Sequence, residues 1–319
     1  MGDAAGIGPE VVLKALAGNS ASRGYRPLII GDLDHLTRQA DLLGLDIALG
    51  ELGKGGDIEV LDLNNLPMDA PLGIDHPSTG KASAEYIEAA VRLWNDGRID
   101  AIATAPISKQ AIALGGYDFP GHTEFLAELT GTDKFAMSFF GGPLRVVLLS
   151  THLSLRSAIE KVRRDALVEL IRFANVQLSA LLGRSVKIAV AGLNPHASEH
   201  GMFGSEEADE IEPAVSICWS EGVDVSGPYS PDTIFVRCHQ GEFDAVIALY
   251  HDQATIAVKA LAFGSAVNVT LGLPLIRTSV DHGTAYDIAG KGIADASSMT
   301  AAIDLAAELA RTKILGSRA

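Results

Sequence analysis

Short apolar segments alternate along the chain with longer segments rich in Ala and Leu. Several apolar segments are continuously hydrophobic, as expected for strands covered on both faces of a sheet. We expect strands at Pro27–Gly31, Asp100–Thr104, Leu144–Ser150, Val186–Gly192, Phe243–Tyr250 and Ala266–Thr270. We expect helices at Gly80–Asp96, His122–Gly131, Asp165–Leu182, Ser205–Glu221 and Ser298–Thr312. This alternation predicts an α/β fold with a largely parallel sheet. The stretch Gly50–Asp75, rich in Gly, Asn and Pro, is expected to be an irregular surface segment.

Composition narrows the class of protein. The 319 residues, 47% of them hydrophobic, can form one large or two modest domains with a buried core. Forty acidic against 25 basic side chains give a net charge of −15, which would repel phosphate backbones, so we expect no nucleic-acid partner. The apolar segments are far shorter than the roughly 20 residues that span a bilayer, and the first residues do not resemble a signal peptide. Together with two cysteines, Cys218 and Cys238, expected to be reduced, this predicts a cytoplasmic protein without a membrane partner.

Three histidines share one sequence context. His152, His196 and His251 each follow a predicted buried strand. Ligands of open α/β sheets bind outside the carboxyl ends of the strands, where three imidazoles can converge on one divalent ion and leave positions open for substrate. Unrelated loop histidines are the alternative, but the shared setting favours a metal site. All-imidazole ligation suits zinc, cobalt or nickel better than calcium.

Two further groups are candidates for anion binding. His122 and Thr123 stand at the predicted start of a helix, where free N–H groups suit a phosphate or carboxylate, although Thr123 could equally be a simple N-cap. Lys259, Asn268 and Arg277 offer cations and an amide near predicted strands and turns, with surface solvation as the alternative for each. The glycines of GDAAGIGPE do not fit a dinucleotide fingerprint and indicate only a tight turn into a helix.

A series of motifs then gives a family resemblance. In chain order they are GDAAGIGPE, ATAPISK, PGHTEFLAEL, STHLSLR, NPHASE, YHDQ and NVTLGLPLIRTSVDHGTAYDIAG. Together they resemble the 4-hydroxythreonine-4-phosphate dehydrogenase family over nearly the whole chain. The stretch DHGTAYDIAGKGIAD is also similar to the loop that holds the adenosine end of NAD in isocitrate and isopropylmalate dehydrogenases, which share the broad fold of the family.

The resemblance implies a fold and a site. The fold would be two α/β/α subdomains, like isocitrate and isopropylmalate dehydrogenases, with the active site in the cleft between them. Residues 1–125 plus 260–319 would form the subdomain with the cofactor loop, and residues 126–259 the one with the metal ligands and the dimer interface. A homodimer would complete the shared active sites.

The resemblance also assigns roles. The metal ligands would be His152, His196 and His251, with zinc as the first choice and cobalt, nickel or magnesium as alternatives. The substrate contacts would be His122, Thr123, Lys259, Asn268 and Arg277. The NAD loop would comprise His282, Gly283, Thr284, Ala285 and Asp287. The proton acceptor is open: Asp252 is a candidate, and orienting the adjacent imidazole is an equal alternative.

The implied activity is the NAD-dependent oxidation of the 3-hydroxyl of a 4-phosphorylated C4 hydroxy acid, with decarboxylation. The substrate would be 4-phospho-D-threonate or 4-phospho-D-erythronate, giving dihydroxyacetone phosphate, or 4-phosphohydroxy-L-threonine, giving 3-amino-2-oxopropyl phosphate for vitamin B6 synthesis. The segments MFGSEE and SPDTIF favour the sugar acids. A zinc-dependent hydrolase and a dihydrodiol dehydrogenase of the same family are the rival activities, and a non-catalytic ligand-binding protein is the rival class.

The sequence departs from the family pattern in places. Family members usually have an apolar strand before the glycine turn, whereas this sequence starts at Met1 within the motif, so we expect a sheet that lacks a strand and is destabilised or partly open. Ala4 stands where Pro is usual, and Ala254 where Gly is usual. If the latter position requires a positive φ, alanine costs roughly 1 kcal/mol there.

Overall fold

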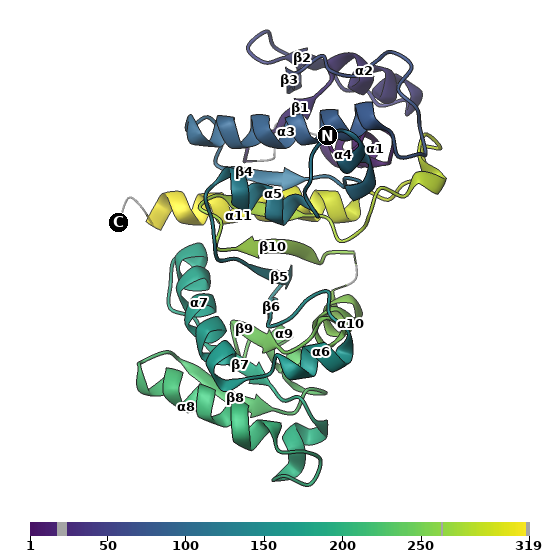
Figure 1. Cartoon of the computed structure of the whole chain (residues 1–319). Coiled ribbons are helices and arrows are strands. Elements are labelled where there is room, and N and C mark those ends of the chain that lie inside the picture. The colour runs from purple at the N-terminus through teal and green to yellow at the C-terminus, as the bar shows by residue number, and fades with distance from the viewer. Residues whose placement is uncertain (18–23, 263, 317–319) are drawn as a thin grey trace. The chain divides into compact units, whose positions relative to one another are not determined.

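The computed structural model describes residues 1–17, 24–262 and 264–316. They divide into two compact units, which we describe separately (Figure 1). Unit 1 comprises Met1–Asp133 and Leu273–Ala307, and unit 2 comprises Lys134–Gly272 and Glu308–Ala319. Both units mix helices with mainly parallel strands, which confirms the predicted α/β class.

Unit 1 contains two groups of parallel strands. Its elements are α1 (Gly8–Leu16), β1 (Leu28–Gly31), α2 (Leu33–Leu42), β2 (Leu49–Glu51), β3 (Ile58–Asp62), α3 (Pro77–Asn95), β4 (Ala101–Thr104), α4 (Lys109–Leu114), α5 (His122–Leu129), β11 (Ile276–Ser279), the short 3₁₀ turn η4 (Tyr286–Ile288) and the first part of α11 (Ser297–Gly316). The strands pair in the order β1-β3-β2, and β4 pairs in parallel with β11. The β4–β11 register sets Thr104 opposite Ser279, so the carboxyl ends of the two strands coincide.

The core of unit 1 follows from the helix and strand periodicities. Helix α1 is buried on most of its surface, and its apolar residues Val11 and Leu13 are fully buried. They form one cluster with Leu36 of α2 and with Ile58 and Val60 of β3, whose side chains alternate along the strand. Burying this surface fixes α1, and with it the glycine-rich turn that precedes the helix.

Unit 2 is built around a mixed sheet. Its elements are β5 (Ala136–Gly141), β6 (Leu144–Leu148), α6 (Leu155–Glu160), α7 (Arg164–Leu182), β7 (Ile188–Ala191), the turn η2 (Pro195–Glu199), the π-helical turn η3 (Glu207–Ile211), α8 (Glu212–Ser220), β8 (Val225–Tyr229), α9 (Ile234–His239), β9 (Ala245–Ala248), α10 (His251–Leu261) and β10 (Val267–Leu271). The strand order is β10-β5-β6-β9-β7-β8, with β5 antiparallel to both neighbours and the strands from β6 to β8 parallel.

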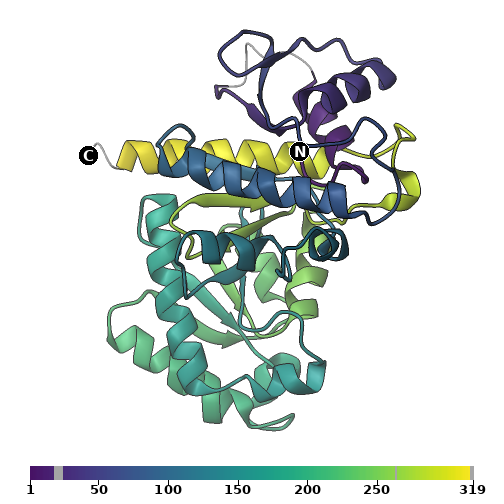
Figure 2. The ribbon, with the colours of Figure 1, turned by 45° about the horizontal axis from the view of Figure 1, so that its top comes forward.

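Helices cover both faces of this sheet. Figure 1 shows α7 and α8 on one side of the strands and α9 and α10 on the other, and Figure 2 shows the same ribbon tilted forward. Strands β7 and β9 are buried at every position, as expected for central strands of such a layered sheet. Because β6, β7 and β9 run in parallel, the residues that follow them all leave the sheet at the same end, where the carboxyl ends of the strands lie.

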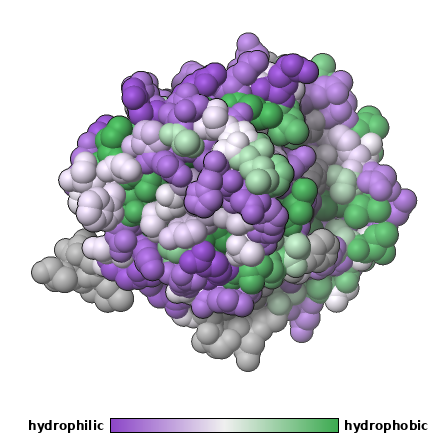
Figure 3. Space-filling model, turned by 90° about the horizontal axis from the view of Figure 1, so that it is seen from below, coloured by the Kyte–Doolittle hydropathy of each residue, from purple (hydrophilic) through white to green (hydrophobic). Residues whose placement is uncertain are grey.

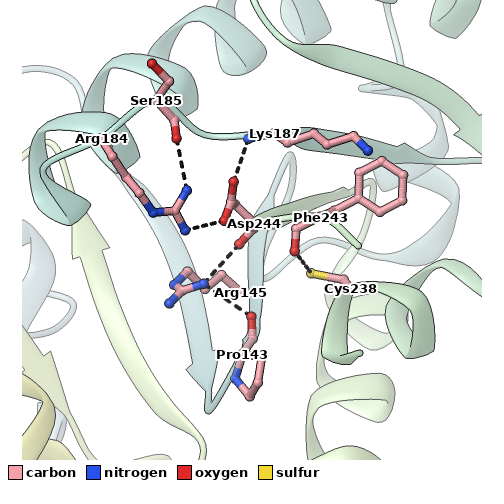
Figure 4. Close-up of polar contacts among 8 residues, drawn as sticks. All are labelled: Pro143, Arg145, Arg184, Ser185, Lys187, Cys238, Phe243 and Asp244. Atoms are coloured by element: carbon pink, nitrogen blue, oxygen red, sulfur yellow. Dashed lines mark hydrogen bonds and ion pairs between the residues drawn. The ribbon is translucent and has the colours of Figure 1, made fainter. Parts of the chain in front are cut away.

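A polar network around Asp244 lies at the opposite end of these strands, where they begin (Figure 4). The Asp244 carboxylate pairs with Arg184 and accepts a hydrogen bond of 2.8 Å from the Lys187 backbone N–H. Its backbone carbonyl accepts a bond of 3.3 Å from Arg145, and the Lys187 ammonium lies 4.6 Å from the centroid of the Phe243 ring. The hydrogen bond from Arg184 is the main cause that lowers the pKa of Asp244. The network ties together the starts of β6, β7 and β9.

The predicted strands and helices are confirmed, apart from shifts of a few residues at their ends. The irregular segment predicted at Gly50–Asp75 is wrong in part. It contains the end of β2 and all of β3, in which Ile58 and Val60 are buried on one face and which pairs with both β1 and β2. In the part of the chain that the structure describes, no helix has both the length and the apolar character needed to cross a membrane.

The first residues of the chain lie against β1. The amino group of Met1 donates a hydrogen bond of 2.7 Å to the Ile30 carbonyl, and its burial lowers the pKa of this amine to about 5. On the other side, the Asp3 backbone N–H donates to the Pro106 carbonyl at 2.9 Å, just after β4. The expectation that the sheet lacks a strand and is destabilised stays a prediction.

Candidate functional site

In unit 1, the start of α5 is open to an anion. The N-cap residue is Gly121, in an extended conformation, and it has no side chain to bond the first-turn N–H groups. Thr123 is therefore not the N-cap, which was the alternative reading of its position. The helix dipole and the first-turn N–H groups both favour a negative charge at this place.

Arg277 is directed at the same helix start. It lies on β11, its side chain is only 4% exposed, and its guanidinium donates to Thr104 Oγ1 at 2.9 and 3.2 Å and to Thr123 Oγ1 at 3.4 Å. Burial lowers the pKa of Arg277 to about 10, which leaves the side chain charged at neutral pH, and Glu124 acts in the opposite direction. The pairing of β4 with β11 brings Thr104 under the guanidinium. A buried cation aimed at a helix start is an arrangement suited to phosphate.

His122, the first residue of α5, lies in the same group. Desolvation by burial lowers its pKa well below 6.5, and the neighbouring positive charge of Arg277 lowers it further. Its ring is therefore neutral at physiological pH and can both donate and accept one hydrogen bond. The structure thus brings together His122, Thr123 and Arg277, three of the five substrate contacts that the resemblance implies, and their role as substrate contacts stays a prediction.

Thr104 belongs to this group and was not among the predicted residues. It is 7% exposed, and besides receiving the Arg277 bonds it donates to the Thr278 carbonyl at 3.2 Å. The available signal was its position: it ends the strand at the start of ATAPISK, a motif to which the sequence analysis gave no role. Hydroxyl residues at the carboxyl end of a parallel strand are common ligand contacts.

Unit 2 brings two of the three candidate metal ligands together. His152 follows β6 and His251 opens α10 after β9, and their ring centroids are 5.8 Å apart. Asp252 contacts His251 directly, with Oδ1 2.7 Å from Nδ1. A carboxylate bonded to one ring nitrogen orients the imidazole and directs the other nitrogen outward, which is the usual partner of a metal-bound histidine.

His196 stands apart from this pair. It is 63% exposed and its Nδ1 is 3.9 Å from an Asp232 carboxylate oxygen. Across residues 1–17, 24–262 and 264–316, no three His, Cys, Asp or Glu side chains are grouped closely enough to hold a metal ion. Within one chain, therefore, His152 and His251 lie together, and His196 is not grouped with them.

The turn that carries His196 has an unusual backbone. The five residues from His196 to His200 all have positive φ angles, between 46° and 64°, and none of them is glycine. Glu207 holds the start of this turn: its buried carboxylate accepts hydrogen bonds of 2.7 Å from the backbone N–H groups of Leu193 and Asn194 and one of 2.9 Å from the Asn194 side chain. Non-glycine residues in this conformation cost energy and are concentrated at functional sites.

The two remaining predicted substrate contacts also lie in unit 2. Lys259 is exposed near the end of α10. Asn268 lies on β10, and its Oδ1 atom is buried without a hydrogen-bond partner in the described part of the chain. A buried acceptor left unpaired costs about 1–3 kcal/mol unless a ligand satisfies it.

The candidate cofactor loop in unit 1 is an extended segment that ends in the turn η4. Gly283 and Asp287 are exposed, and Ala285 has a φ of 44°. Nothing lies within 4 Å of the position that a Cβ would take at Gly283, so the chain there can be approached closely by a ligand. His282 Nε2 is buried and unpaired among the residues described, while Nδ1 lies 3.0 Å from the Gly283 carbonyl. Thr284 precedes Ala285 and contacts the glycine-rich turn through its backbone.

Comparisons with known proteins identify the family. The model of the family described as pyridoxal phosphate biosynthetic protein PdxA matches residues 23–306. D-threonate 4-phosphate dehydrogenase of Cupriavidus necator is 45% identical, over 97% of this chain and 96% of the relative. 4-Hydroxythreonine-4-phosphate dehydrogenase of Desulforapulum autotrophicum is also 45% identical, over 96% and 93%. The crystal structure of 4-hydroxythreonine-4-phosphate dehydrogenase from Klebsiella pneumoniae superposes with a TM-score of 0.89 at 40% identity, covering 97% of this chain and 98% of that one.

These matches confirm the resemblance drawn from the motifs, and they extend over almost the full length of the relatives. The oxidoreductase class is likewise supported, because the named relatives are dehydrogenases. This chain therefore belongs to the PdxA family of dehydrogenases.

Proposed function

We propose that this protein oxidises the 3-hydroxyl of a 4-phosphorylated C4 hydroxy acid with NAD and a divalent metal, and that the product loses carbon dioxide. Hydride leaves C3 for the nicotinamide, and a base accepts the hydroxyl proton. The bond between C2 and the carboxylate then breaks, CO₂ departs, and a proton takes its place on C2. With 4-phospho-D-threonate or 4-phospho-D-erythronate the product is dihydroxyacetone phosphate.

The group at the start of α5 carries the proposal. A phosphate dianion there would accept hydrogen bonds from the first-turn N–H groups and the Thr123 hydroxyl, and would neutralise the buried Arg277. The neutral His122 ring can bond the same ligand or a substrate hydroxyl without adding charge. Held at its phosphate end, the substrate has few orientations left, which is the main contribution that positioning makes to rate.

The side chains of the candidate metal ligands in unit 2 are chemically suited to bind a divalent metal. His152 and His251 lie side by side, and Asp252 occupies only one nitrogen of His251. Imidazole donors suit zinc, with cobalt and nickel next and magnesium last. When bound, such a metal would lower the pKa of a ligated hydroxyl and polarise the ketone formed from it.

We further propose that His196 comes from the second subunit of a homodimer, since one chain does not group the three histidines. Exposed apolar side chains flank the candidate ligands and suit an interface: Leu153, Leu155 and Ile159 after His152, and Met202 and Phe203 after His196. Figure 3 shows one face of the molecule, on which hydrophobic and hydrophilic residues are interspersed.

For the cofactor, we propose the loop that contains His282, Gly283, Thr284, Ala285 and Asp287. Its unpaired His282 Nε2 and the open space at Gly283 are both suited to a ligand that approaches the backbone closely. NAD, when bound there, would serve as the hydride acceptor. The proton acceptor would be Asp252 if the Asp252–His251 contact opens, but in the structure this carboxylate orients the imidazole, and we propose that as its first role.

Between the possible substrates, we propose the sugar acids first and 4-phosphohydroxy-L-threonine second. The relatives named for each activity are equally similar to this chain, at 45% identity, so the choice depends on the MFGSEE and SPDTIF segments. Lys259 and Asn268 are the proposed contacts to the part of the substrate that differs between the acids.

The test is NADH formation from each of the three acids, using protein stripped of metal with a chelator and then supplied with zinc, cobalt, nickel or magnesium. Turnover of the sugar acids, dependent on metal, is expected. Turnover of 4-phosphohydroxy-L-threonine alone would move the protein to vitamin B6 synthesis. No turnover of any acid with any metal would contradict the dehydrogenase proposal and favour a hydrolase.

A further inference from the structure

The glycine-rich turn before α1 has no role in the proposed function, yet the candidate cofactor loop packs against it. The Ile7 backbone N–H donates to the Thr284 carbonyl at 2.9 Å. A Cβ placed on Gly6 would lie 2.7 Å from that carbonyl oxygen and 2.9 Å from the Thr284 Cβ. The loop therefore packs on the backbone of the turn at a distance that only glycine allows.

A side-chain contact reinforces this packing near the end of the loop. The Tyr286 hydroxyl donates to Asp3 Oδ2 at 2.6 Å and lies 3.0 Å from Asp75 Oδ1. Asp3 is completely buried, and its other oxygen accepts a bond of 2.9 Å from the Ala5 backbone N–H. Burial raises the pKa of Asp3, and the hydrogen bond from Tyr286 opposes that rise. Asp3 is thus a fixed acceptor, and Tyr286 is tied to it.

A second clamp holds the segment that follows the loop. Glu10 of α1 is 3% exposed, and its Oε1 accepts from the Ala294 backbone N–H at 2.8 Å and from Lys14 Nζ at 2.7 Å. Lys14 in turn donates to the carbonyls of Gly292 and Ala294 at 3.0 and 2.9 Å. The candidate cofactor loop and the segment that follows it are thus both held by α1 and by the turn that precedes this helix.

From this arrangement we propose that Tyr286 is a positioning residue for the dinucleotide: through Asp3 it holds residues 282–287 in the conformation that binds the adenosine end of NAD. The inference rests on the proposed function, because the ligand of the loop is NAD only if that proposal holds. A loop already ordered in its bound conformation loses less entropy when the ligand binds, so the contact would raise cofactor affinity without touching the reacting atoms.

The test is Tyr286→Phe, which removes only the hydroxyl oxygen. The Tyr286–Asp3 bond has an ionisable acceptor, and bonds of that kind are stronger than bonds between neutral groups. Loss of this hydrogen bond would weaken NAD binding only indirectly, through the order of the loop. We therefore expect the Kd and KM for NAD to rise about 10-fold. The kcat at saturating NAD and the KM for the phosphorylated acid should stay within about twofold, since the hydroxyl makes no contact in the reaction. A general loss of structure would instead lower kcat as well.

The matched control is Tyr86→Phe. Tyr86 is a buried tyrosine of the same unit whose hydroxyl donates to Asn65 at 2.9 Å and not to Asp3. NAD affinity should be unchanged in this variant. If wild-type protein binds NAD and Tyr286→Phe binds it equally well, the positioning role is refuted and the proposed function stands. If the wild-type protein does not bind NAD, measured by calorimetry, both are refuted.

Discussion

At the scale of single residues, burial decides which charges the site presents. Arg277 keeps its charge although it is buried, whereas His122, beside it, is held neutral. The two neutral hydroxyls of Thr104 and Thr123 orient the guanidinium. The planar fork of arginine can hold two threonines and a phosphate at once, and the ammonium of lysine cannot reproduce that geometry.

Replacing Arg277 with lysine should therefore lower activity even though the charge is kept. We expect Arg277→Lys to lower kcat/KM for the phosphorylated acid by about 10- to 100-fold, mainly through KM, because a bidentate contact is lost. The measurement is steady-state kinetics at saturating NAD. Arg172→Lys, at an exposed pair with Glu221, is the control and should behave like wild type. An unchanged KM in Arg277→Lys would refute the phosphate role.

The depressed pKa of His122 should appear in the pH dependence of stability. Its folded pKa lies below the unfolded value of about 6.5, so the unfolded chain takes up the proton first as the pH falls. Stability that is present above pH 6.5 is therefore lost below it. In urea unfolding from neutral pH downward, His122→Asn should lose less stability than wild type, because the variant lacks the side chain whose protonation favours the unfolded chain. Equal losses in both proteins would show that His122 titrates normally.

At the scale of elements, strands whose own residues form a clear apolar pattern could be predicted. Strands that are defined by contacts with distant residues could not. The central strands β7 and β9 are continuously apolar and were predicted from that alone. Strands β3 and β11 were missed, because each contains polar residues and is defined by its partner strand. For the site, His122, Thr123 and Arg277 were each named from the sequence, but their grouping was not predicted. The contribution of Thr104 depends on the register of β4 with β11, which the sequence does not display.

The left-handed turn at residues 196–200 is the clearest example of a distant contact overriding local preference. We expect Glu207→Ala to lower the free energy of unfolding by about 2–4 kcal/mol, because three hydrogen-bond donors lose a charged acceptor in a buried place. Glu206→Ala is the matched control: the Glu206 carboxylate also accepts from the Asn194 side chain, at 2.7 Å, but Glu206 is only partly buried, so its loss should cost about 1 kcal/mol. Denaturant unfolding measures both. A smaller effect for Glu207→Ala than for Glu206→Ala would refute the role of Glu207 in the turn.

At the scale of the whole molecule, the proposed dimer can be tested by mixing inactive variants. His196→Ala and His251→Ala should each be inactive alone. In a mixed dimer, one of the two sites would receive His152 and His251 from one subunit and His196 from the other, all intact. Random exchange makes half of the dimers mixed, so about a quarter of wild-type activity should return.

The matched mixture is His152→Ala with His251→Ala. These two residues lie together in one chain, so neither site of the mixed dimer would be intact and no activity should return. Light scattering checks that dimers are present in both mixtures. If the first mixture is as inactive as the second, the three histidines act from a single chain and the shared site is refuted.

The order of the two units along the chain also has a consequence for folding during protein synthesis. Almost all of unit 2 is one continuous segment, Lys134–Gly272, whereas unit 1 needs Met1–Asp133 and also Leu273–Ala307. The pairing of β4 with β11 joins residues near 101 to residues near 276, a long loop to close. On the ribosome, unit 2 can therefore form its sheet while the first 133 residues, although made earlier, still lack β11. The part of the protein that is translated first is then the part that is completed last.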